Sequence, residues 1–94
     1  MMKMAEFSNR HNDFHHSGFQ FVNVELDTGL TFARIALGAK GPGKIERNRV
    51  NAGKAYDSAM HVLSTLTLEG DQAATVREKA SALKSSLQKL GEEL

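Results

Sequence analysis

The stretch GAKGPGKI, residues 38–45, contains residue types that can grip a phosphate. A P-loop needs glycine at each end of a four-residue span, then lysine, then serine or threonine, so that backbone amides wrap the phosphates and the hydroxyl holds magnesium. Gly38, Gly43 and Lys44 meet the first demands, but Ile45 stands where the hydroxyl belongs. The residues before the stretch have helical rather than strand periodicity. The sequence therefore favours a turn between two helices over a phosphate loop.

A simpler anion-binding site around this turn is the remaining hypothesis for phosphate chemistry. Five cations surround the expected start of the second helix, and the single acid Glu46 leaves a local charge of +4; the cations are Lys40, Lys44, Arg47, Arg49 and Lys54. Cations at a helix N-terminus oppose the helix dipole, so the cluster is either a solvated basic face or a binding site. The cluster has no aromatic residue to stack on a base, which disfavours single-stranded nucleic acid as its ligand.

The histidines near the N-terminus are weak metal candidates. His11 and His15 are four residues apart, as two zinc ligands on one helical turn would be, and His16 follows them. Nothing in the pattern makes this segment helical, so adventitious metal affinity is favoured over a built site.

Catalytic chemistry is not indicated in the rest of the chain. Asp57, Ser58 and His61 share one expected helix face, but neither a pocket nor an oxyanion hole accompanies them. The chain has no cysteine, which excludes a thiolate metal site and a cysteine nucleophile. We expect no enzyme and no cofactor.

Apolar residues recur at helical spacing in three stretches, which predict helices over about 19–40, 44–67 and 72–92. In the first stretch Val24 and Ile35 widen the apolar sector, so this helix is expected to be the most buried. Short connections make consecutive helices antiparallel, which predicts an all-α, up-down-up three-helix bundle over residues 18–94. Residues 1–17 are polar and unpatterned, and are expected to form a flexible or partly docked arm.

The helix registers predict two polar contacts. Glu25 falls inside the apolar sector of the first helix and is expected to accept a hydrogen bond from Tyr56 of the second. Arg49 points inward and is expected to form a structural ion pair with Glu92 or Glu93 at the end of the third helix.

Length and composition further limit the possible fold and location of the protein. A chain of 94 residues with 40% apolar and 24% charged residues is a single domain of ordinary globular composition. No run approaches the roughly 20 apolar residues of a membrane span, and the N-terminus lacks the core of a signal peptide. We expect a soluble, cytoplasmic protein with no membrane partner. The net charge of +1 confines any electrostatic recognition to a local patch.

Two segments resemble parts of a known interaction module. AGKAYDSAM, residues 52–60, looks like the middle helix of MIT (microtubule interacting and transport) domains, and more loosely the small-residue code of tetratricopeptide repeats. VREKASALKSSLQKL, residues 76–90, is similar to the third MIT helix. The resemblance implies a module without catalysis that binds peptide helices in a groove, with Val76, Lys79, Leu83 and Leu90 as the positions to test. Leu87 departs from it, because the MIT pattern prefers alanine there and leucine can fill the groove.

Two hypotheses about function follow. The leading one is a small non-enzymatic helical module for protein–protein interaction, acting through self-association or by docking a helix against the third helix. The alternative is anion or nucleic-acid binding through the basic cluster at the first turn, whose affinity would fall steeply with salt.

Overall fold

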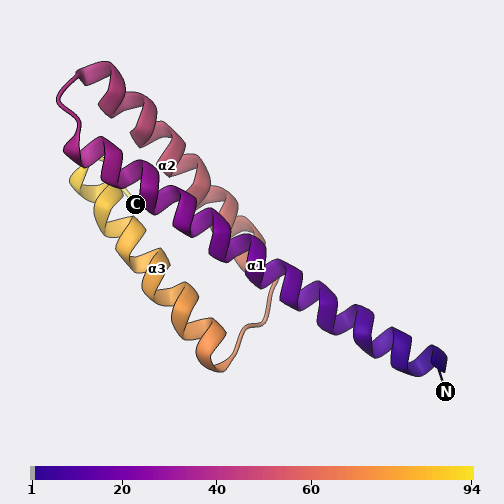
Figure 1. Ribbon diagram of the computed structural model, residues 1–94. Helices are drawn as coiled ribbons and strands as arrows, with labels where there is room; N and C mark the ends of the chain where they lie inside the picture. The colour runs from indigo at the N-terminus through magenta and orange to yellow at the C-terminus, as the bar shows by residue number, and fades with distance from the viewer. Residues whose placement is uncertain (1) are drawn as a thin grey trace.

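The computed structural model describes the backbone of residues 2–94 and the side chains from residue 16 onward. It has three helices, α1 (Met2–Gly38), α2 (Pro42–Leu63) and α3 (Gly70–Lys89), and no strand within this part of the chain. α1 contacts both other helices extensively, whereas α2 and α3 contact each other little, so α1 lies between them (Figure 1). The predicted all-α, up-down-up three-helix bundle is confirmed.

The N-terminal boundary differs from the prediction. The sequence predicts that the first helix starts at about residue 19, whereas α1 begins at Met2. The flexible or partly docked character expected for residues 1–17 stays a prediction. Between Met2 and Gly18 the sequence contains neither glycine nor proline, so no residue interrupts the helix there. The later, apolar part of α1 anchors this helix on its neighbours. An unpatterned polar segment can therefore continue a helix whose packing lies further along the chain.

The first turn is a helix-to-helix connection, as predicted. Pro42 takes the first position of α2, where its missing amide hydrogen costs nothing, so α2 starts two residues earlier than expected. α2 ends at Leu63 instead of near 67. There the hydroxyls of Ser64 and Thr65 donate to the carbonyl oxygens of His61 and Val62, at 2.6 and 2.7 Å, and satisfy acceptors of the last turn.

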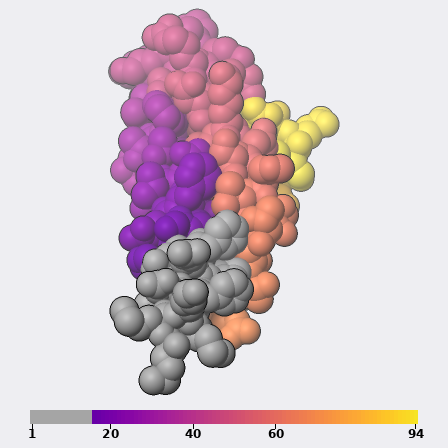
Figure 2. Space-filling view, turned by 90° about the vertical axis from the view of Figure 1, so that its right-hand side faces the viewer, coloured from indigo at the N-terminus to yellow at the C-terminus, as the bar shows by residue number. Residues whose placement is uncertain are grey.

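α3 ends in a Schellman motif, which stops the helix at Lys89 instead of the expected 92. Gly91 has φ +99°, a left-handed conformation that glycine adopts without strain. The amide of Glu92 donates to the carbonyl of Leu87, and that of Gly91 to the carbonyl of Gln88, each at 3.0 Å. The residues after the motif stand out from the body of the molecule (Figure 2), and Leu94 is 48% exposed.

Small residues bring the helices together at the core. The buried apolar residues are Val22, Leu26, Ala33, Ala36, Ala52, Ala55, Ala59, Val76, Leu83 and Leu87. A Cβ atom on Gly29 of α1 would lie 2.5 Å from Leu83 Cδ2 on α3 and 3.2 Å from Ala55 Cβ on α2. The three helices therefore meet at a position that only glycine fits without rearrangement.

α1 is not buried all round, which corrects the expectation for Val24 and Ile35. Val24 is 59% exposed and Ile35 38% exposed, and Phe21 on the same side is 45% exposed. Two neighbouring helices cover only the side of α1 that faces them. The opposite side keeps an apolar surface with no element over it in the described part of the chain.

Candidate docking groove between α2 and α3

An open groove of about 570 Å³ runs between α2 and α3, because both helices pack on α1 and hardly touch each other. The α2 side and the following connection contribute Tyr56, Met60, Leu63, Leu66 and Leu68. The α3 side contributes Ala73, Val76, Arg77, Ala80, Ser81 and Lys84. The volume lies in the range of ligand sites, roughly 300–1,000 Å³, but the groove is open along its length and suits an elongated ligand.

The connection between α2 and α3 forms one end of the groove. The side chain of Leu66 lies close to α1 at Gly18, where an added Cβ atom would be 2.6 Å from Leu66 Cδ2. Gly18 therefore lets the connection approach α1 closely. Leu66 and Leu68 are both half-buried and pack against the core. The apolar lining at this end is thus held in place by the fold.

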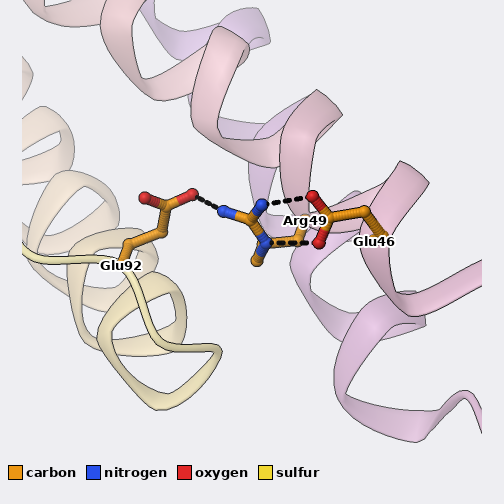
Figure 3. A network of polar contacts seen from close by, with 3 residues as sticks. All are labelled: Glu46, Arg49 and Glu92. Carbon is orange, nitrogen blue, oxygen red and sulfur yellow. Dashed lines mark hydrogen bonds and ion pairs between the residues drawn. The ribbon is translucent and has the colours of Figure 1, made fainter. Parts of the chain in front are cut away.

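An ion-pair network of Glu46, Arg49 and Glu92 joins α2 to the segment that follows α3 (Figure 3). Arg49 of α2 donates through Nε to Glu46 Oε2 at 3.0 Å and through Nη2 to Glu46 Oε1 at 2.5 Å. Its Nη1 donates to Glu92, which the Schellman motif turns toward α2. The predicted ion pair between Arg49 and the end of the third helix is confirmed, with Glu92 as the partner.

The network shifts the pKa values of two of its members. The hydrogen bonds from Arg49 lower the pKa of Glu46 below its ordinary value, and the positive charge of the guanidinium adds to the effect. The same hydrogen bonds raise the pKa of Arg49 further above its ordinary value. The shifts of Glu46 and Arg49 both favour the charged forms of this pair within α2.

The charged groups that line the groove are all basic. Arg77 and Lys84 lie on the exposed edge of α3, and no acidic residue lines the groove. Neither cation takes part in the ion pairs formed among the described side chains, which involve Arg49 and Lys79. The groove thus combines an apolar floor with a positive edge.

The partner-binding positions implied by the resemblance lie mostly in the α1–α3 interface. Val76 and Leu83 are buried, and Leu90 packs half-buried against the core. Lys79 reaches α1, where its Nζ lies 2.9 Å from Asp27 Oδ1 and donates to Asn23 Oδ1 at 2.7 Å. Among these four positions only Val76 lines the groove.

These positions lie in the interface because the residues that carry the resemblance lie on the side of α3 that packs in the core. Apolar residues at three-four spacing mark the side that packs on α1, and the groove lies one step round the helix, at Arg77, Ala80, Ser81 and Lys84. Leu87 is fully buried in the core and does not fill the groove, contrary to what the sequence indicates. Neither Arg77 nor Lys84 was predicted from the sequence as a binding residue, because the sequence pattern shows nothing at these positions beyond a positive charge.

Tyr56 also takes a different role from the expected one. The hydrogen bond to Glu25 is absent among the side chains that the structure describes, and Tyr56 lines the groove instead. Glu25 is half-buried on α1. The register placed both residues near the bundle interior but did not resolve which side of α2 turns toward α1.

The basic cluster at the first turn is only partly brought together. Lys40, Lys44, Arg47 and Lys54 are exposed, whereas Arg49 is engaged by two carboxylates. Lys54 lies ten residues after Lys44, about 15 Å along α2. The N-terminus of α2 has no side-chain cap. The cluster is a cationic helix tip of three residues and not a site of five converging groups.

The histidine candidates form no metal site that the structure describes. The side chains of His11 and His15 lie outside the described residues, and His16 is exposed. Among the side chains from residue 16 onward, no group of three potential metal ligands converges.

Comparisons with protein-family models, curated proteins and solved structures gave no match to this chain. Within the part of the chain that the structure describes, no helix combines the length and the apolar character needed to cross a membrane.

Proposed function

We propose that this protein is a small non-enzymatic interaction module that holds a helix of a partner protein in the groove between α2 and α3. The observation that carries the proposal is the open apolar groove, with half-buried Tyr56, Met60 and Leu63 along one wall and no element of the described chain covering it. Burying such a surface stabilises a complex by roughly 25 cal/mol per Å² of apolar area, before the costs of association.

The dimensions of the groove favour a helix as the ligand. Its α2 wall extends from Tyr56 to Leu63, two turns or about 10 Å of helix, and the connection adds Leu66 and Leu68. A partner helix lying along it presents apolar residues at positions i, i+3 or i+4, and i+7. This is also the kind of ligand that the resemblance to MIT domains implies, although other residues of α3 line the groove here.

Charge complementarity favours an acidic partner. Arg77 and Lys84 stand at the edge of the groove without a carboxylate among its lining residues. Acidic side chains flanking the apolar face of the partner helix would pair with them and speed association. We therefore propose an amphipathic helix with a net negative charge as the ligand, and the cytoplasm as the place where the two proteins meet.

The experiment is a binding titration with a library of acidic amphipathic helical peptides, read by fluorescence anisotropy. We expect Arg77→Glu/Lys84→Glu to weaken binding about ten-fold or more, because two favourable pairings become repulsive. The matched control is Lys44→Glu/Arg47→Glu, which reverses one lysine and one arginine at the other end of α2 and is expected to leave peptide affinity within about two-fold.

The same pair of variants separates the proposal from anion binding. If the exposed Lys40, Lys44 and Arg47 form the functional site, a polyanion such as heparin or a nucleic acid binds with steep salt dependence, and Lys44→Glu/Arg47→Glu abolishes that binding. Absence of peptide binding together with such polyanion binding would replace the groove by the helix tip as the site of function.

A further inference from the structure

The outward side of α1 carries an apolar stripe that the bundle leaves uncovered. Phe21, Val24 and Ile35 are 45%, 59% and 38% exposed, and Thr28 and Thr31 are exposed between them. These five residues, here called the α1 seam, are separated alternately by three and four positions. That alternation is the spacing of a coiled-coil contact, and the seam contains no charged side chain.

We propose that the α1 seam pairs antiparallel with the α1 seam of a second copy of this chain. An alignment that sets Val24 opposite Ile35 of the second copy also sets Thr28 opposite Thr31 and Phe21 opposite Gly38. By two-fold symmetry each pairing occurs twice. Gly38 has open space around it, so the large ring of Phe21 meets the smallest residue on the facing helix.

The charged residues beside the seam favour this occupant and this orientation. Asp27 and Arg34 both lie along one edge of the seam, and the same alignment brings Asp27 of each copy to Arg34 of the other. Arg34 takes no part in the ion pairs formed among the described side chains. Asp27 contacts Lys79 at 2.9 Å yet remains 53% exposed, so a second cation can reach it. A parallel pair would bring no cation to Asp27.

The area of the seam sets the expected strength of the dimer. About five turns of helix on each copy would bury on the order of 1,000 Å² in total, the lower limit for a specific interface. We therefore expect a reversible dimer with a dissociation constant in the micromolar range, roughly 1–100 μM. No residue of α1 lines the groove, so a dimer through the α1 seam leaves both grooves free of seam residues.

The association test is sedimentation velocity over a concentration series up to about 300 μM, well above the expected constant. The wild type is expected to dimerise, and Val24→Lys to weaken dimerisation about ten-fold or more, because it sets an ammonium against Ile35 of the other copy. Val50→Lys is the matched control, since Val50 is 36% exposed on α2 and lies outside the seam. Both substitutions are at exposed positions, and circular dichroism verifies that the variants keep their helix.

Disulfide cross-linking tests the orientation, and the chain offers a clean background because it has no cysteine. A mixture of Val24→Cys and Ile35→Cys proteins is expected to cross-link, whereas Val24→Cys alone is not. A monomeric wild type, or undiminished dimerisation of Val24→Lys, would overturn the second copy as occupant and leave the stripe to a helix of another protein. Rapid cross-linking of Val24→Cys alone would overturn the antiparallel arrangement.

Discussion

Gly29 of α1 lies against side chains of both α2 and α3. We expect Gly29→Ala to lower the free energy of unfolding by on the order of 1 kcal/mol. Alanine favours helix over glycine by about 1 kcal/mol, but overpacking a filled core costs roughly 1–3 kcal/mol and outweighs that gain. The new Cβ would lie 2.5 Å from Leu83 Cδ2 and 3.2 Å from Ala55 Cβ. Urea unfolding measures the change.

Gly38 supplies the control for this prediction. It lies at the end of the same helix with no atom within 4 Å of its added Cβ, so Gly38→Ala is expected to be neutral or slightly stabilising. A stabilising Gly29→Ala would contradict the close packing at this position. Strong non-additivity with Leu83→Ala would identify Leu83 as the group that is displaced.

The carboxylate of Glu46 reports on the ion-pair network. Arg49 lowers the pKa of Glu46, so Arg49→Gln is expected to raise that pKa toward its ordinary value, as measured by NMR titration of the carboxyl carbon. A carboxylate with a depressed pKa stabilises the fold above its unfolded pKa and loses that contribution as the pH falls through its folded pKa. Acidification from neutral pH should therefore destabilise the wild type more than the variant. Identical Glu46 pKa values in both proteins would contradict the network.

At the scale of the elements, Gly91 decides how α3 ends. Its φ of +99° is unfavourable for any residue with a Cβ atom. Gly91→Ala is therefore expected to lower the free energy of unfolding, measured by thermal unfolding, by about 1 kcal/mol. It should also displace Glu92 from Arg49. Gly53→Ala, in the middle of α2 with only Glu92 Oε1 at 3.8 Å, is expected to be neutral or stabilising, which separates the left-handed requirement from a general effect of removing glycine.

The two sides of α3 should respond differently to truncation. Leu83 is fully buried, so Leu83→Ala is expected to lower the free energy of unfolding by about 2–5 kcal/mol. Lys84 is exposed on the neighbouring side of α3, and Lys84→Ala is expected to change the free energy of unfolding by less than about 0.5 kcal/mol. Equal effects in chemical denaturation would contradict the assignment of one side to the core and the other to the groove.

Apolar periodicity was sufficient to predict the three helices, because each must place one side against a neighbour. Periodicity alone could not say which side of α1 stays uncovered, and so Val24 and Ile35 were wrongly expected inside. It also could not separate the core stripe of α3 from the groove beside it. Arg49 was paired correctly with the end of the third helix because antiparallel packing sets the start of α2 beside Glu92. Its second partner, Glu46 on the same helix, was not predicted. The terminal breaks depended on Gly91 and on hydroxyl groups that bond locally, which helix spacing does not encode.

At the scale of the whole molecule, the three-helix bundle carries two distinct apolar surfaces. Residues of α2, α3 and their connection line the groove, whereas the α1 seam consists of exposed residues of α1. Because the two surfaces share no residue, variants of one leave the other intact, and peptide binding and dimerisation can be tested separately.

The most direct test of the central claim is to map where an acidic amphipathic helical peptide binds. In a titration of isotopically labelled protein followed by NMR, the account predicts shifts concentrated at Tyr56, Met60, Val76, Arg77 and Lys84. Shifts concentrated at Lys40, Lys44 and Arg47, or no binding up to about 1 mM peptide, would contradict the groove as the functional site.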